Sequence, residues 1–233
     1  ITDAIKAYDV VTGKVKEKHI GILLSYPASV VNEKPLIRLK DRPSEKVKTD
    51  DKIFIGFIGA GNFATSYRLT LLEKIKNTNL VGVCNTSGVN AKSVAKKFGF
   101  EYCTSRSEEI FDNAKVNTVF IASRHDSHAE YILRALESGK HVFVEKPLCI
   151  NKEQLEEIKL KASKSAGNIL RVGFNRRFSK PFVDIKIFFT EINEPLLINY
   201  RVNAGFIPKE HWIQDPVQGG RIIGEVCHFI DCM

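Results

Sequence analysis

The feature that most constrains the fold is the stretch 52–64, KIFIGFIGAGNFA. An apolar run, 53–58, leads directly into a glycine-rich turn at 59–64. The run is typical of a buried parallel strand, and the glycine spacing is typical of the turn between such a strand and a helix. Because a strand of this kind needs strands beside it and helices over it, the stretch predicts an α/β protein.

The residue types in this turn suit a phosphate group. Gly59 permits the tight turn, Gly61 lets the backbone approach a pyrophosphate, and the small Ala64 lets the helix close on the strand. The first N–H groups of that helix would then face the anion. Taken alone, the motif leaves two interpretations open, a dinucleotide site or an ordinary strand–helix turn.

From residue 52 onward, apolar strand-like runs alternate with helix-like segments. The alternation predicts a Rossmann-type, doubly wound parallel sheet that is covered by helices on both faces. The expected strands are 53–58, 79–84, 117–122, 141–144 and 169–173, and the expected helices are 62–76, 89–98, 107–113, 126–139 and 151–166. Residues 52–173 are therefore expected to form a dinucleotide-binding domain.

The region before this domain has a different character. Residues 1–31 are expected to form an extension with a helix at 2–12 and an apolar strand at 19–26. The stretch 32–51 is polar, charged and punctuated by prolines, so it is predicted to be a linker.

Composition narrows the class of protein. Among 233 residues, 35 Lys and Arg against 27 Asp and Glu give a net charge of +8, but the basic residues are scattered and few aromatic residues alternate with them. This pattern disfavours nucleic-acid binding and leaves a solvated basic surface or attraction to acidic ligands. No apolar run approaches the ~20 residues that span a membrane, and no signal-peptide pattern opens the chain, so a cytoplasmic protein is expected.

The five cysteines are odd in number and form no C-x-x-C pair, which predicts reduced thiols. Cys227, His228 and Cys232 lie close together in the sequence. They lack a convincing fourth ligand, so no metal site is expected.

The position that selects between NAD and NADP comes directly after the second strand. About 20 residues after a glycine turn, an acidic residue commonly binds the ribose hydroxyls of NAD. Asn85 stands there instead, so no carboxylate repels a 2′-phosphate, and Thr86, Ser87 and Lys92 are available to receive one. The sequence does not decide between NAD and NADP at this position. An ordinary polar loop between strand and helix, with no role in cofactor binding, is the alternative interpretation.

Two further motifs stand where strands of the sheet end. Residues 123–128, SRHDSH, come after the strand 117–122, and Glu145-Lys146-Pro147 comes after the strand 141–144. Ligands of α/β sheets bind at these carboxyl ends. A lysine that is fixed by a following proline is placed to direct a cation into the cleft, although an ordinary charged turn would also fit.

Together these motifs resemble the glucose–fructose oxidoreductase/inositol 2-dehydrogenase family (Gfo/Idh/MocA). The resemblance extends from about residue 52 to 233. Its carriers are IGFIGAGNFA (55–64), VFIASRHDSHAE (119–130), ALESGKHVFVEKPL (135–148), VGFNRRFS (172–179) and GGRIIGEVCHFID (219–231). The E-K-P motif and the final histidine motif are its most specific parts.

The resemblance implies roles for individual residues. It implies that the histidine His228 exchanges a proton with the substrate hydroxyl and that Lys146 lies against the same oxygen, a pairing that suits hydride transfer because negative charge develops on that oxygen. Glu225 is expected to orient the imidazole or to bind a sugar hydroxyl. The residues implied at the cofactor are Gly59, Gly61, Asn62, Phe63, Asn85, Thr86, Ser87, Ser123, His125, His128, Glu145, Lys146 and Arg176.

The sequence departs from the family pattern G-G-G-x-x-x-D-x-G-x-H near its end. Gln218 replaces the first glycine, Gly224 the aspartate and Val226 the later glycine, while the acid has moved to Glu225. Ile213 stands where an arginine is usual. Because of these changes, the role of Glu225 near His228 is the part of the resemblance that most needs a test.

The resemblance also implies a second domain after the first. Residues 174–233 are expected to begin an α+β substrate domain, with 196–203 as the first strand of an open mixed sheet whose completion would form homo-oligomer contacts. Only the start of that domain is present, so we expect an excerpt of a longer chain. Residues 1–27 resemble the C-terminal end of zinc-type medium-chain alcohol dehydrogenases, without zinc ligands, which suggests a fused parent.

The function expected from these features is NAD(P)-dependent oxidoreduction at a hydroxyl or keto carbon of a sugar, cyclitol or nucleotide-sugar. The partner would be a small carbohydrate-like substrate, with no nucleic acid and no membrane. The alternative is a catalytically silent dinucleotide-binding protein whose cofactor regulates an interaction, which the altered region around His228 would permit.

Overall fold

The computed structural model describes residues 4–23, 36–39, 52–165 and 167–233. The chain divides into two compact units, 1–34 and 35–233. In the first unit, the helix α1 (Ala4–Val11) forms within the expected range 2–12. Residues 19–23 of the expected strand 19–26 form no strand, since no neighbouring strand pairs with them, and the rest of that prediction lies outside the described residues.

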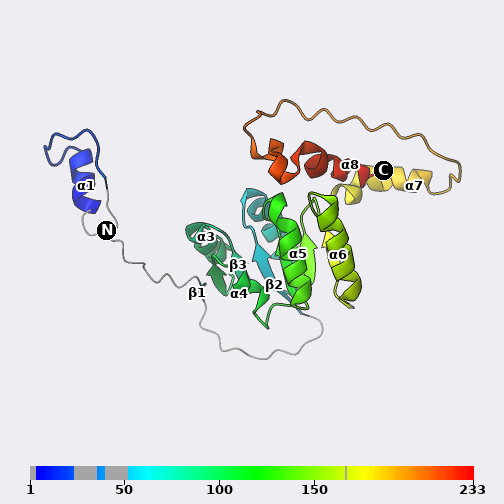
Figure 1. The fold of residues 1–233 in the computed structure, drawn as a ribbon, viewed down its shortest axis with the longest axis horizontal. Helices are drawn as coiled ribbons and strands as arrows, with labels where there is room; N and C mark the ends of the chain where they lie inside the picture. Colours follow the sequence, from blue (N-terminus) through cyan, green and yellow to red (C-terminus); the bar gives the residue numbers. More distant parts are fainter. Residues whose placement is uncertain (1–3, 24–35, 40–51, 166) are drawn as a thin grey trace. The chain divides into compact units, whose positions relative to one another are not determined.

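The second unit is built on one seven-stranded sheet in the order β1-β4-β3-β2-β5-β6-β7 (Figure 1). All neighbouring strands run parallel except β1 and β4, which pair antiparallel at one edge. The strands are β1 (Leu36–Arg38), β2 (Ile53–Ile58), β3 (Thr78–Cys84), β4 (Tyr102–Thr104), β5 (Thr118–Ile121), β6 (His141–Val144) and β7 (Leu170–Val172). The predicted Rossmann-type α/β fold is confirmed.

Helices cover both faces of the sheet, and β2 shows why. Phe54 and Ile58 pack into one buried cluster, whereas Ile55 and Phe57 pack into the other, as alternation along a strand requires. The first cluster includes side chains of α4 (Glu108–Phe111), α5 (His128–Glu137) and α6 (Lys152–Lys164). The second includes side chains of η1 (Ala64–Arg68), α2 (Leu69–Leu72) and α3 (Gly88–Phe98).

Local signals in the sequence fix the ends of two of these helices. The Ser87 side chain accepts a hydrogen bond from the N–H of Asn90 at the start of α3, and Gly99 ends that helix in the left-handed conformation at φ 73°. The Asn151 side chain accepts from the N–H of Gln154 at 2.9 Å and begins α6. The loops before these helices follow β3 and β6 and therefore lie at the carboxyl edge of the sheet.

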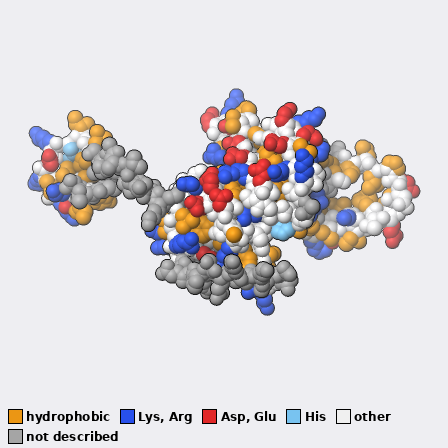
Figure 2. Space-filling model, turned by 60° about the horizontal axis from the view of Figure 1, so that its bottom comes forward, with side chains coloured by type: hydrophobic (Ala, Val, Ile, Leu, Met, Phe, Trp, Pro, Cys, Tyr) orange, Lys and Arg blue, Asp and Glu red, His pale blue; other side chains and the backbone are white. Residues whose placement is uncertain are grey.

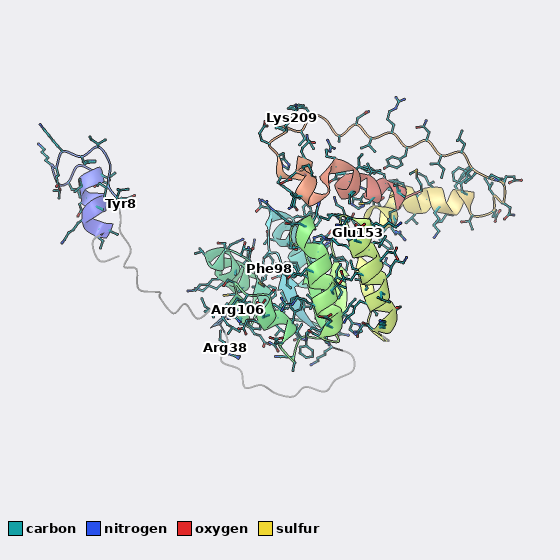
Figure 3. All side chains as sticks on the ribbon, in the orientation of Figure 1. Tyr8, Arg38, Phe98, Arg106, Glu153 and Lys209 are labelled. Carbon is teal, nitrogen blue, oxygen red and sulfur yellow. The ribbon has the colours of Figure 1, made fainter. Side chains whose placement is uncertain are left out.

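Beyond β7 the chain forms short helical elements rather than a second sheet. They are η3 (Arg176–Phe178), α7 (Lys180–Phe189), η4 (Trp212–Gln214), η5 (Pro216–Gln218), η6 (Ile222–Val226) and α8 (Cys227–Ile230), and the 3-10 turn η2 (His125–Ser127) precedes α5. Residues 190–211 connect α7 to η4 as a long strap, on which Lys209 lies near the end (Figures 1 and 3).

Three features of this unit differ from the expectations. The predicted strand 196–203 is wrong: it lies in the strap, and no strand of the described residues runs beside it to form a ladder. The short edge strand β1 forms within the expected linker 32–51 and pairs Ile37 with Cys103. The helix α7 is not among the expected elements, although Pro181 in its first turn is a favourable start signal.

The described surface and side chains can be examined for charge, membrane-spanning helices, metal-ligand groups and disulfides. Figure 2 shows Lys and Arg side chains interspersed with Asp and Glu on the face turned forward. Within the described ranges, no helix is both long and apolar enough to cross a membrane. No group of three or more His, Cys, Asp or Glu side chains in the same part of the chain is arranged to hold a metal ion, and the five cysteines are free thiols.

Candidate active site

The glycine turn is shaped by contact with the strand beside it. Gly59 has a φ of +88°, and a Cβ atom there would lie 2.4 Å from the backbone nitrogen of Ser123. A Cβ atom on Gly61 would meet no atom within 4 Å, so the backbone is open at that point. Ala64 is 1% exposed and packs in the core. Gly59 therefore serves the fold, whereas Gly61 leaves room for a ligand.

This difference predicts separate effects of two matched substitutions. Gly59→Ala is expected to lower the free energy of unfolding by about 2 kcal/mol or more, because both the positive φ and the backbone contact oppose a side chain. Gly61→Ala should leave stability within about 0.5 kcal/mol but weaken NAD(P)H binding. Urea unfolding and cofactor titration of both variants measure this; equal destabilisation by the two would contradict the assignment.

The loop after β3 lies against the glycine turn. The N–H of Gly59 donates to the carbonyl of Cys84 at 3.0 Å, and the Asn90 side chain donates to the carbonyl of Ala60 at 3.3 Å. Asn85 is half-buried, and Thr86 and Ser87 are exposed beside it. The residues expected to select the cofactor thus flank the turn, and Asn90, which the sequence analysis did not single out, links the two.

The loop 123–128 contains one histidine that faces the cleft and one that does not. His128 is fully buried, with Nδ1 2.7 Å from the carbonyl of Pro147 and Nε2 3.1 Å from the carbonyl of Ser123. Burial lowers its pKa, and a neutral ring donates to only one of these carbonyls. His128 therefore ties the Ser123 loop to the loop that carries Lys146.

His125 lies at the cleft instead. Its Nδ1 is 3.0 Å from the carbonyl of Gln218, and its ring meets the edge of Trp212 at 5.1 Å between centroids. A Cβ atom on Gly224 would lie 3.0 Å from the His125 ring, so the aspartate usual at position 224 would crowd this histidine. Gln218 and Gly224, both departures from the family pattern, thus belong to one packing arrangement around His125.

Glu145 is held by an arginine from the helix after the glycine turn. The Arg68 Nε donates to Glu145 Oε1, and both side chains are largely buried. The guanidinium carbon also lies 5.6 Å from the Phe63 ring centroid and 5.2 Å from that of Phe143. Arg68 Nη2 is buried and has no hydrogen-bond partner among the described residues. Sequence reasoning missed Arg68, because 77 residues separate it from Glu145.

Lys146 contacts the last helical segment of the chain. Its ammonium donates to the carbonyl of Gly224 at 2.8 Å and to Glu225 Oε1 at 2.9 Å. His228 is 7% exposed, and its Nδ1 is buried without a hydrogen-bond partner in the described part of the chain. Glu225, which belongs to the π-type turn η6, thus binds Lys146 and makes no hydrogen bond to His228 in the described structure, since the ammonium is the stronger partner.

The environment of His228 keeps its imidazole neutral. Burial, and then the charges of Lys146, Arg176 and Arg68, lower its pKa from 6.5 to about 4, while Glu225 opposes this shift. A neutral imidazole has a free nitrogen lone pair at pH 7. At pH 7 His228 therefore has a nitrogen free to accept the proton of a hydroxyl group, and its lowered pKa makes it a weaker base than a free imidazole.

This shift predicts the pH dependence of His228. Its ring resonances should titrate with a midpoint of about pH 4, and Lys146→Met should raise that midpoint toward 6.5. Since the unfolded chain takes up this proton at a higher pH than the folded chain, this group lowers the free energy of unfolding as the pH falls from 6.5 to 4. NMR titration with His228→Gln for assignment measures the midpoint; a midpoint at or above 6.5 would contradict the shift.

These side chains surround one cavity of about 640 Å³. Gly59, Gly61 and Asn62 lie on the turn next to it, and Asn85, Thr86, Ser87 and His128 do not line it. The lining includes Ser179 and Ile213, which were not predicted as site residues. The lining residues are Phe63, Ala122, Ser123, His125, Glu145, Lys146, Asn175, Arg176, Ser179, Trp212, Ile213, Glu225 and His228.

The arrangement fits a dinucleotide. The open backbone at Gly61 leaves the space that a pyrophosphate needs, and the polar loop 85–87 lies on the side where the adenosine ribose belongs. The cavity at the carboxyl ends of β5 and β6 provides the position for the nicotinamide end. The residues present therefore suit both halves of such a cofactor.

Comparison with known proteins agrees with this geometry. Residues 53–174, a little over half of the chain, match the model of the Gfo/Idh/MocA oxidoreductase family, described as having an NAD-binding Rossmann fold. An NAD⁺-dependent scyllo-inositol 2-dehydrogenase of Bacillus subtilis is 30% identical over 141 residues, which cover 60% of this chain and 41% of the relative. An inositol 2-dehydrogenase of Salmonella typhimurium is 26% identical over 158 residues, or 66% of this chain and 47% of the relative.

Solved structures show the same likeness. An NAD-binding protein from Listeria innocua has a TM-score of 0.67 at 31% identity and matches 78% of this chain and 53% of its own. A 3-ketoreductase from Actinomadura kijaniata, crystallised with TDP-benzene and NADP, has a TM-score of 0.56 at 27% identity. The match covers 60% of this chain and 44% of the ketoreductase chain. The chain spans about half the length of the curated relatives it matches. It belongs to the Gfo/Idh/MocA family of oxidoreductases with an NAD-binding Rossmann fold.

Proposed function

We propose that this chain is part of an NAD(P)-dependent dehydrogenase or reductase that acts on a hydroxyl or keto carbon of a sugar, cyclitol or nucleotide-sugar. The observation that carries the proposal is the convergence of Lys146 and the neutral His228 on one cavity beside the glycine turn. A base and a cation on one oxygen suit the oxidation of a carbinol. The relatives named as inositol dehydrogenases support the substrate class.

Each residue of the pair would act on the substrate oxygen. The bound nicotinamide would supply or accept the hydride. His228 would take the hydroxyl proton, and in the reverse direction it would return that proton to the carbonyl oxygen. Lys146 would stabilise the negative charge that develops on this oxygen. Glu225 would hold the ammonium in position through the 2.9 Å contact.

The proposed seat of the cofactor is the glycine turn, with Asn62 and Phe63, the loops at Asn85 and Ser123, and Glu145 with Arg176. NAD and NADP are both compatible with the uncharged Asn85. Asn85→Asp is expected to shift the ratio of NADPH to NADH affinity toward NADH by about tenfold or more, because a carboxylate repels a 2′-phosphate. Separate fluorescence titrations measure the ratio. Asn85→Ser, which adds no charge, is the control, and an unchanged ratio in Asn85→Asp would place the adenosine ribose elsewhere.

The proposal is tested by titrating the chain separately with NADH and NADPH and following the fluorescence of the cofactor. A screen of inositols, aldoses and nucleotide-sugars by nicotinamide absorbance then identifies the best substrate. We expect saturable binding of at least one cofactor and reduction of its oxidised form by a polyol or sugar. Failure to bind either cofactor would refute the oxidoreductase assignment.

A silent dinucleotide-binding protein is the second candidate. The observation in its favour is that Lys146 already donates to Gly224 and Glu225, so that its ammonium is engaged within the protein. Lys146→Met discriminates between the two functions. An enzyme should lose turnover and keep its cofactor affinity, whereas a silent binding protein has no turnover to lose.

Two features of the longer polypeptide are proposed as well. The resemblance of residues 1–27 to the end of an alcohol dehydrogenase supports a fused parent. The complete second domain is proposed to carry the contacts of a homo-oligomer. The sequence of the full gene tests the first, and light scattering of its product tests the second.

A further inference from the structure

A second cavity, of about 350 Å³, adjoins the candidate active site and shares Arg176 and Glu225 with it. It lies between η3, the strap and the turn before α8. Tyr200 and Asn203 come from the strap, and Arg221 precedes η6. Apart from Arg176 and Glu225, its lining residues have no part in the proposed chemistry.

Aromatic contacts build one wall of this cavity. Tyr200 stacks between Phe182 and Phe229, with ring centroids 6.0 and 5.3 Å apart. The Arg176 guanidinium lies 5.1 Å from the Phe229 ring centroid. The strap, α7 and α8 are thus joined at this point, and the stacked rings position both Arg176 and the segment that carries Arg201.

The charge in this cavity is unbalanced. Arg176, Arg201 and Arg221 all line it, and none of them has an ion-pair partner among the described residues. Glu225 is the one acid among the described residues that line this cavity, and it is engaged by Lys146. The neighbouring Arg177, by contrast, is paired with Asp231.

Three guanidinium groups without acidic partners favour a ligand that brings its own negative charge. The planar guanidinium donates two parallel hydrogen bonds to a carboxylate or a phosphate, and such contacts are stronger than neutral hydrogen bonds. Residues 59–62 of the glycine turn and the loop 85–87, where the cofactor phosphates would lie, line neither cavity. The anion therefore belongs to the substrate side.

We propose that Arg176, Arg201 and Arg221 form a subsite for the carboxylate or phosphate of an acidic carbohydrate whose reacting carbon lies in the adjoining cavity. This inference rests on the proposed function and specifies its substrate as a sugar acid or sugar phosphate. Neutral inositols and hexoses would leave the three charges unmatched and would bind more weakly.

The test is calorimetric titration of the chain, with and without saturating NADH, using D-glucuronate, glucose-6-phosphate, D-glucose and inorganic phosphate. We expect at least one of the two sugar anions to bind about tenfold or more tightly than D-glucose, with an advantage that falls as salt is added. The preferred sugar anion identifies the group that the subsite takes.

Substitutions assign the effect to the arginines. Arg201→Ala and Arg221→Ala should each weaken binding of the preferred sugar anion by about 5- to 10-fold and leave D-glucose and NADH binding unchanged. Lys209→Ala is the matched control, because Lys209 is basic and lies on the same strap but outside the cavity lining (Figure 3). It should change none of these affinities.

The possible results of these titrations distinguish failure of the proposed anion subsite from failure of the proposed oxidoreductase function. If NADH binds but neither sugar anion binds more tightly than D-glucose, or if inorganic phosphate binds as tightly as the sugar anion, the subsite is wrong and the oxidoreductase assignment stands. If the arginine variants weaken D-glucose and the sugar anion equally, the subsite is also wrong. If neither NADH nor NADPH binds but arginine-dependent binding of a sugar anion persists, the subsite stands and the oxidoreductase assignment fails.

Discussion

Replacing His228 by glutamine is expected to lower kcat by about 10²- to 10⁴-fold with the best substrate of the screen, the contribution typical of a general base. The other histidine in the lining of the cavity, His125, is engaged at Nδ1 by the Gln218 carbonyl and packs against Trp212. Glutamine keeps a polar side chain of similar reach but does not take up a proton. Steady-state kinetics measure the loss, and NADH titration should show an affinity within about threefold of the parent chain.

His141→Gln provides the matched control. His141 begins β6, away from the carboxyl edge, and its Nδ1 accepts from the N–H of Ile169 at 3.0 Å. Its replacement should leave kcat within about threefold. If His228→Gln and His141→Gln lose the same activity, His228 is not the base.

Replacing Lys146 by methionine is expected to lower kcat by about 10²- to 10³-fold, the loss observed when one donor to a developing oxyanion is removed. Methionine keeps much of the side-chain volume but removes the one ammonium among the described residues that line the candidate active site. The same change leaves Glu225, whose side chain is 25% exposed, without its partner. Some loss of stability is therefore expected in addition to the loss of turnover.

The double variant Lys146→Met with Glu225→Gln separates these effects. It removes the unpaired carboxylate, so it should regain stability in urea unfolding without regaining turnover. Glu225→Gln alone keeps the ammonium and should lower kcat by no more than about tenfold. Recovery of turnover in the double variant would show that Lys146 acts only by neutralising Glu225.

The sequence predicts the sheet well because its signals are local. The apolar runs at 53–58 and 141–144 coincide with β2 and β6, and each is long enough to show a buried strand by itself. The expected strand 196–203 also has an apolar run, but strand formation depends on a partner elsewhere in the chain. β1 and β4 have three residues each and stand in polar surroundings, so no apolar run reveals them, whereas the equally short β7 lies in a run with Ile169, Leu170 and Val172.

The residues of the candidate site also fall into two groups, those that short sequence motifs mark and those that only the fold brings together. Glycine spacing and the E-K-P motif mark Gly61 and Lys146 within short windows of sequence. The contact between Lys146 and Glu225 spans 79 residues, so the helical spacing between Glu225 and His228 does not predict it. The cluster that includes Arg201 and Arg221 is also assembled only by the fold.

The glycine turn, Lys146 and His228 are proposed to form one site for a nicotinamide cofactor. The single tryptophan of the chain, Trp212, lines the same cavity and reports on it directly. Energy transfer from Trp212 to NADH or NADPH is the decisive measurement. We expect saturable quenching of Trp212 with sensitised cofactor emission, weakened in Gly61→Ala and lost in Trp212→Phe while binding persists. Cofactor binding that leaves Trp212 emission unchanged, or no binding at all, would contradict this account.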